Sequence, residues 1–220
     1  MNHTTRQTAS ILGIYAGLLG VVHGLFEVAQ GATAPHGLGI SAIGAPCQSS
    51  LVWHACLPAM TIVPNFLITG ILAIAFSAAA IAWAALFVAS KHGGLILILL
   101  SILMLLVGAG IIPPLTGVIA GAAATRINAP LTFVRTRLSG QVSSLLAPIW
   151  LWALIVFLTW SVAVWGVGYV ANQVMTNLSC LSLVLDLALP GLIALSGLAR
   201  DSSHAGQALP ARPSMTAHTG

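Results

Sequence analysis

The sequence predicts an all-α fold, a polytopic transmembrane helical bundle of five spans. Hydrophobic residues make up 58% of its 220 residues and charged residues only 5%, where about 25% charged is usual in soluble chains. In addition, five apolar stretches are each long enough to cross about 30 Å of hydrocarbon, which takes a helix of roughly 20 residues. We therefore expect an integral, multi-pass protein of the cell (plasma) membrane, with the lipid bilayer as a partner.

The expected spans cover residues 10–31, 60–90, 94–125, 144–171 and 178–199. Helices are expected because lipid offers no partner to an unpaired backbone group. Ala32-Thr33-Ala34 resembles the cleavage site of a signal peptide, but Pro35 follows it directly, so we expect the first span to be retained. Residues 1–200 then form a single transmembrane domain, and residues 201–220 form a disordered polar tail.

The third stretch contains Pro113-Pro114, which leaves two span counts open. Two prolines remove two backbone donors and force a kink or a hairpin. We predict five spans with a kinked third helix, because only eleven residues separate these prolines from Arg126. A hairpin at Pro113-Pro114 would instead give six spans.

The number of spans decides which orientation in the membrane agrees with the positive-inside bias, the excess of lysine and arginine on the cytoplasmic side. Five spans with the N-terminus outside leave Arg6 and Lys91 outside, and put five arginines on the cytoplasmic side: Arg126, Arg135, Arg137, Arg200 and Arg212. Reversing the chain inverts the ratio, so five spans favour an external N-terminus. Six spans would put all seven basic residues inside.

His23 and Glu27 form the first candidate site. They lie four residues apart in the first span, so their side chains share one helix face. Glycines on that face, among them the pairs Gly13/Gly17 and Gly20/Gly24, allow a neighbouring helix to approach closely. Buried ionisable groups in a membrane are costly and usually face a bundle interior or a water path. The pair is either a proton or cation site or a hydrogen-bonded packing contact, with a metal or haem site as a third interpretation.

Asp186 is the second carboxylate inside an expected span, about halfway along the fifth. Ser182 shares its face, and Pro190 lies four residues further on, where it cannot donate to the Asp186 carbonyl oxygen. A carboxylate beside a backbone oxygen freed by a proline resembles the ion sites of interrupted transporter helices. We predict that His23, Glu27, Ser182 and Asp186 form an ion, proton or substrate site; the alternative is a kinked helix with Asp186 bonded to a neighbour.

The connection between the first two spans carries four residues of metal-ligating types. His36, Cys47, His54 and Cys56 have the right chemistry for a metal ion, although their spacing matches no standard zinc pattern. Cys47 and Cys56 could instead form a disulfide, if this connection faces an oxidising compartment. Unpaired structural thiols are the third possibility. The disulfide would require an internal N-terminus, against the five-span charge count.

Three classes of function are compatible with these features. The first is a small solute or ion transporter or channel with a proton- or cation-linked intramembrane site. The second is a structural or assembly subunit of a membrane complex, and a homo-oligomer is also possible. The third is a redox protein whose histidines bind haem or a metal ion; otherwise we expect no cofactor. We do not expect an enzyme, because no motif for hydrolysis, phosphoryl transfer or dinucleotide binding appears. Seven basic against three acidic residues are too few for a nucleic-acid surface.

Overall fold

The computed structural model describes residues 1–41, 57–132, 136 and 139–207, and this part of the chain is mostly helical, which confirms the all-α prediction. Its long or apolar helices are α1 (His3–Ala29), α2 (Phe66–Leu86), α3 (Gly93–Leu106), α4 (Ile112–Ala124), α7 (Ile149–Val170) and α9 (Ser179–Gln207). Two short helices, α6 (Gly140–Leu146) and α8 (Asn172–Asn177), flank α7. Strands β1 (Gly39–Ser41) and β2 (Pro58–Met60) pair antiparallel, with Ile40 opposite Ala59.

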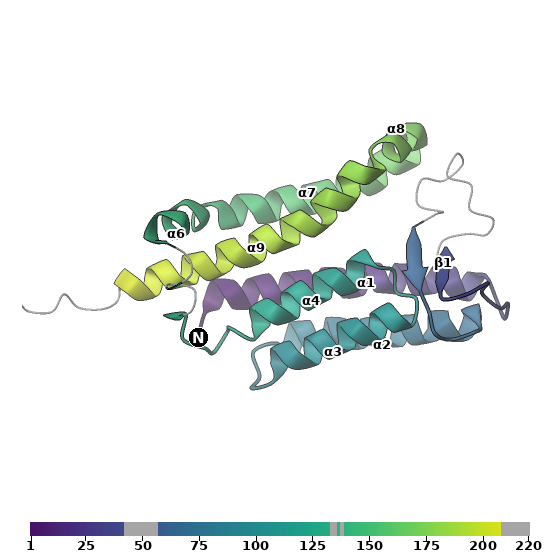
Figure 1. The fold of residues 1–220 in the computed structure, drawn as a ribbon, viewed down its shortest axis with the longest axis horizontal. Coiled ribbons are helices and arrows are strands. Elements are labelled where there is room, and N and C mark those ends of the chain that lie inside the picture. The colour runs from purple at the N-terminus through teal and green to yellow at the C-terminus, as the bar shows by residue number, and fades with distance from the viewer. Residues whose placement is uncertain (42–56, 133–135, 137–138, 208–220) are drawn as a thin grey trace, which may run out of the picture.

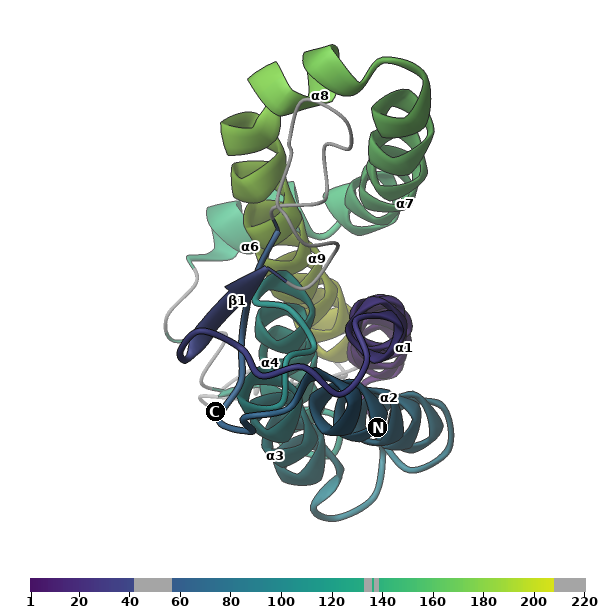
Figure 2. The same cartoon turned by 90° about the vertical axis from the view of Figure 1, so that its right-hand side faces the viewer.

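The long helices run alongside one another in three layers (Figure 1). One layer holds α7 and α9, the middle layer holds α1 and α4, and the third holds α2 and α3; the view along the helices shows the same order (Figure 2). The β1–β2 pair lies at the end of the bundle where α1 ends and α2 begins. The fold therefore has a four-helix unit, α1 to α4, joined to the α7–α9 pair.

The glycine face of α1 is packed against α2. A Cβ atom added at Gly13 would lie 2.7 Å from the Cβ of Ala84, and one added at Gly24 would lie 2.8 Å from the backbone oxygen of Gly70. Since residue numbers rise on one helix as they fall on the other, the two helices are antiparallel. The prediction that this face allows close helix approach is confirmed.

The expected kinked third helix is wrong, because the third stretch folds as an antiparallel hairpin of α3 and α4. A Cβ at Gly94 would lie 2.5 Å from the backbone oxygen of Gly121, and a Cβ at Gly117 would contact the Ser101 hydroxyl. Pro113 and Pro114 fall in the first turn of α4. A missing backbone donor has no cost there, so the proline pair starts a helix instead of bending one.

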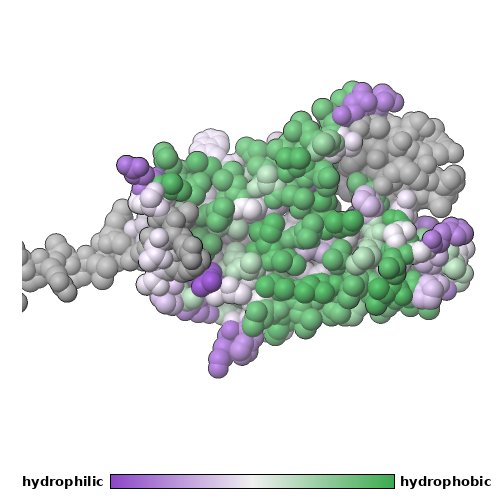
Figure 3. Space-filling model, viewed as in Figure 1, coloured by the Kyte–Doolittle hydropathy of each residue, from purple (hydrophilic) through white to green (hydrophobic). Residues whose placement is uncertain are grey.

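In the part of the chain that the structure describes, four helices are long and apolar enough to cross a membrane: α1, α2, α7 and α9. The hairpin helices, with 14 and 13 residues, are shorter than the roughly 20 residues that a full crossing takes. The five-span count is therefore not confirmed. Hydrophobic residues cover the middle of the face shown in Figure 3, and hydrophilic ones gather towards the two ends, as an integral membrane protein requires.

The predicted tail begins too early, because α9 continues through Asp201 to Gln207. The Asp201 carboxylate accepts hydrogen bonds from the backbone N–H groups of Thr4 (3.1 Å) and Thr5 (2.7 Å), and from the Thr5 hydroxyl. An acidic side chain is favourable at a helix N-terminus, where backbone donors lack partners. Asp201 therefore joins the end of α9 to the start of α1. Residues 208–220 lie outside the described part of the chain.

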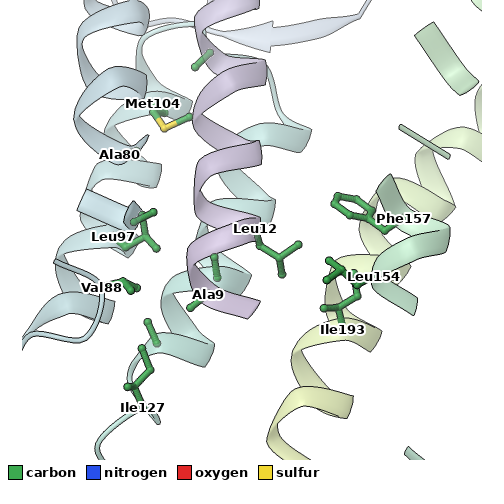
Figure 4. Packing of buried hydrophobic residues seen from close by; sticks show 14 of the residues in the cluster. Ala9, Leu12, Ala80, Val88, Leu97, Met104, Ile127, Leu154, Phe157 and Ile193 are labelled. Atoms are coloured by element: carbon green, nitrogen blue, oxygen red, sulfur yellow. The ribbon is translucent and has the colours of Figure 1, made fainter. Parts of the chain in front are cut away.

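The apolar core joins the layers through α1 (Figure 4). Leu12 projects from α1 towards Phe157 of α7 and Ile193 of α9, and all three side chains are fully buried. On the other side of α1, Leu97 and Met104 of α3 are also fully buried. The α7–α9 pair is thus held against α1 near the end that carries both the N-terminus of α1 and the C-terminal part of α9.

Candidate functional site

Glu27 is fully buried near the end of α1. Its exposed fraction is 0%, and neither carboxyl oxygen has a hydrogen-bond partner among the described residues. His23, one turn earlier on the same face, is 7% exposed. The structure shows the shared inward face predicted for the two residues. Burying an unpaired polar group costs about 1–3 kcal/mol, so Glu27 is not explained by stability.

Both side chains lie against the turn between α3 and α4, residues 107–111. Gly108 and Gly110 have φ values of +89° and +82°, a backbone conformation that residues with a Cβ rarely adopt. A Cβ added at Gly108 would contact both carboxyl oxygens of Glu27, and one added at Gly110 would lie 2.8 Å from Nε2 of His23. The two glycines therefore let the turn close onto the acid and the imidazole.

A pair of threonine hydroxyls lies next to this turn. Thr61 and Thr69 are buried, and their Oγ1 atoms are 2.9 Å apart. Thr61 also pairs with Val107 in an isolated β-bridge, and the backbone N–H of Ile62 donates to the Leu106 carbonyl oxygen at 3.0 Å. Through these backbone contacts, the segment after β2 holds the turn in place against Glu27. The sequence left a hairpin open in this stretch but put its break at Pro113-Pro114; the Gly-Ala-Gly before that pair is the signal of the turn.

Asp186 lies on α9 and is half-buried between α9 and α7. Its Oδ1 accepts a hydrogen bond from the Trp160 indole N–H (3.1 Å), and its Oδ2 accepts one from the Ser182 hydroxyl (3.3 Å). Ser182 and Asp186 therefore share one face of α9, as predicted, and the hydrogen bonds are of the kind expected from the alternative in which Asp186 is bonded to a neighbour. α9 continues through Pro190 without interruption. Trp160, which we did not assign to the site, fixes one carboxylate oxygen.

One cavity brings the two candidate sites together. It has a volume of about 360 Å³ and lies between α1, α4, α7 and α9. His23 from α1 and both Ser182 and Asp186 from α9 line it, although about 150 residues separate the two helices in sequence. Glu27 is not among its lining residues and lies one turn beyond His23. Of the four predicted site residues, three therefore share a cavity and the fourth is buried behind it.

The metal and disulfide predictions rest mainly on residues outside the described ranges. Cys47, His54 and Cys56 lie there, and His36 is exposed in the connection before β1. Within residues 1–41, 57–132, 136 and 139–207, no group of three or more His, Cys, Asp and Glu side chains is placed to hold a metal ion. Cys180, at the start of α9, is exposed.

The basic residues in the described ranges gather at one end of the bundle. Arg6 lies near the start of α1, Lys91 between α2 and α3, Arg126 after α4, and Arg200 near the end of α9. Three contacts hold these segments together: the Asn2 N–H donates to the Ile127 oxygen, the Asn128 amide donates to the Ala89 oxygen, and Asp201 accepts from the start of α1. The connection that carries the cysteines starts and ends at the opposite end, at β1 and β2.

The chain matches no known family model, no curated protein and no solved structure. Any assignment of function therefore depends on the site itself.

Proposed function

We propose that this protein is a small solute or ion transporter or channel of the cell membrane, with a proton- or cation-linked site formed by His23, Glu27, Ser182 and Asp186. The observation that carries the proposal is the cavity between the α1–α4 unit and the α7–α9 pair, with His23 on one wall and Asp186 on the other. Ionisable residues inside a membrane are costly, and where they occur they commonly mark ion or proton pathways.

The position of the cavity favours a role in transport over a role in helix packing alone. Transporter binding sites typically lie where two helical units meet, because small movements between the units can open the site to either side. Here the two walls belong to different units, which contact each other mainly through α1, α4 and α9. Glu27, buried behind His23, supplies a second acid that can hold a proton on the same path.

The same proposal fixes an orientation. Because Arg6, Lys91, Arg126 and Arg200 share one end, the positive-inside bias puts that end, and with it the N-terminus, in the cytoplasm. The external N-terminus expected from five spans depended on the kinked third helix, which the hairpin replaces. The β1–β2 end then faces outside, where a disulfide between Cys47 and Cys56 is chemically possible.

Cysteine labelling tests this orientation. Lys91 and Leu38 are exposed at opposite ends, so Lys91→Cys and Leu38→Cys are made with the native cysteines replaced by serine. In intact cells, a membrane-impermeant maleimide should label Leu38→Cys at once and Lys91→Cys only after permeabilisation. The reverse pattern would show that the N-terminus is outside.

Flux through liposomes tests the transport proposal. Protein reconstituted with an internal pH dye is challenged with Na⁺, K⁺ and small organic amines, under an imposed pH gradient. We expect flux above that of protein-free liposomes, and a loss of about tenfold or more in Asp186→Asn, which is at least about 1.4 kcal/mol. The asparagine amide oxygen can still accept from the Trp160 indole N–H, and its amide N–H can donate to the Ser182 hydroxyl, which accepts as well as donates, so the fold should survive. Asp201→Asn, the same change outside the cavity, is the matched control and should keep its flux.

A structural subunit is the second candidate, favoured by one observation. Both oxygens of Asp186 already accept hydrogen bonds, from Trp160 of α7 and Ser182 of α9, which is what a residue that orders helix packing needs. This alternative predicts no flux in any of the conditions above, and a fall in thermal stability in Trp160→Phe, which removes the indole donor. Flux that depends on Asp186 would exclude it.

A further inference from the structure

The walls of the cavity define the kind of molecule that fits it. Among the described residues that line it, Asp186 is the only carboxylate, and neither lysine nor arginine is present. The ionisable side chains among them are Tyr15 and His23 of α1 and Asp186 of α9, while the described side chains of α4 and α7 contribute none. With Asp186 ionised and His23 neutral, this described lining carries a single negative charge, which favours a monovalent cation and disfavours an anion.

The carboxylate is held in a fixed position. Trp160 and Ser182 each donate to a different oxygen of Asp186, at 3.1 Å and 3.3 Å. Hydrogen bonds to an ionised group stabilise its charged form and restrict its orientation. Asp186 can therefore present a charge to the cavity without moving.

The rest of the wall suits a weakly hydrated ligand. Most lining side chains are aliphatic or proline, contributed by all four helices and by the segment at the start of β2. Such walls cannot replace the water shell of a small inorganic ion, which needs about six or more oxygen ligands. They do favour apolar surface, and the aromatic residues Tyr15 and Trp165 line the same space, where a ring face can attract an organic cation.

We infer that this cavity binds a small monovalent organic cation, an amine or quaternary ammonium with an apolar body, whose charge pairs with Asp186. The volume of about 360 Å³ lies near the lower limit of small-molecule pockets, which run from about 300 to 1,000 Å³. The inference rests on the proposed function and names the substrate class of that site. A proton on Asp186 or on His23 removes or opposes the binding charge, so protons and this cation compete.

Three probes of similar shape and different charge test the inference on the purified full chain. Radiolabelled benzyltrimethylammonium is measured by equilibrium dialysis, with neopentylbenzene as its neutral analogue and benzenesulfonate as an anion. We expect saturable binding of the cation, weaker at acid pH, that neither the neutral nor the anionic probe displaces. Displacement by neopentylbenzene at equal concentration would overturn the inference and define an apolar pocket without charge selection.

Variants of Asp186 test whether its carboxylate is the charge that pairs with the bound cation. Asp186→Asn should weaken binding of benzyltrimethylammonium by about tenfold or more, because one partner of a desolvated charge pair is lost. Asp186→Glu should retain part of the affinity, and Asp201→Asn should retain all of it. If Asp186→Asn binds as well as the wild type, the inference is wrong.

The flux assay separates this inference from the proposed function. Binding of the cation that depends on Asp186, without flux in liposomes, would overturn transport and leave the cation site standing. Flux of protons or inorganic cations without any binding of benzyltrimethylammonium would overturn the substrate class and leave transport standing.

Discussion

Gly108→Val should prevent the protein from folding to a stable state. Gly108 has φ of +89°, and a β-branched residue in that conformation is a genuine outlier. Its new Cβ would also contact both carboxyl oxygens of Glu27 and lie 2.6 Å from Cγ2 of Thr69. Strain of this kind costs about 1–3 kcal/mol, and overpacking adds about 1–3 kcal/mol. The measurement is the yield of monodisperse protein in detergent and its thermal unfolding midpoint.

The matched control is Gly166→Val, the same substitution in α7. A Cβ at Gly166 meets no heavy atom within 4 Å, so this variant should unfold within a few degrees of the wild type. If Gly108→Val were as stable as Gly166→Val, the turn between α3 and α4 would not hold Glu27 as described.

The helices and the α3–α4 hairpin show what the sequence could and could not predict. The helical stretches and the inward face of His23 and Glu27 follow from apolar length and a period of 3.6 residues, which are local properties. The local sequence also contains a signal for the hairpin, but this signal is ambiguous. Pro113-Pro114 is compatible with a kink as well as with the first turn of a new helix. Only the packing of Gly94 against Gly121 decides between them, and that contact joins residues far apart in the chain.

The residues of the candidate site could be named from the sequence, but their arrangement could not. The cost of burying a carboxylate in a membrane singles out Glu27 and Asp186, because of the three carboxylates in the chain these two fall inside expected spans. Nothing local places Asp186 in the same cavity as His23, because that depends on how the α7–α9 pair sits against α1. Trp160 was not assigned to the site, since a donor to a distant carboxylate has no spacing signature.

Glu27→Met should make the protein more stable while removing the proposed transport activity. Methionine has nearly the volume of glutamate and no polar group, so it fills the space between α1 and the α3–α4 turn without an unpaired oxygen. Since neither Glu27 oxygen has a hydrogen-bond partner in the part of the chain that the structure describes, the substitution should gain about 1–3 kcal/mol. The measurements are the thermal unfolding midpoint and the flux in liposomes, made on one preparation.

Glu27→Gln separates the two effects. The amide keeps the shape and the burial cost of a polar group, so its stability should stay near that of the wild type, but it cannot take up and release a proton. If Glu27 acts in transport, both variants lose flux and only Glu27→Met gains stability. A less stable Glu27→Met would mean that the carboxyl group supports the fold, and normal flux in Glu27→Gln would remove it from the site. A functional acid in a membrane is expected to lower the stability of the protein and to be required for its activity. For a residue kept for packing, Glu27→Met would instead lower the unfolding midpoint, and Glu27→Gln would leave the flux unchanged.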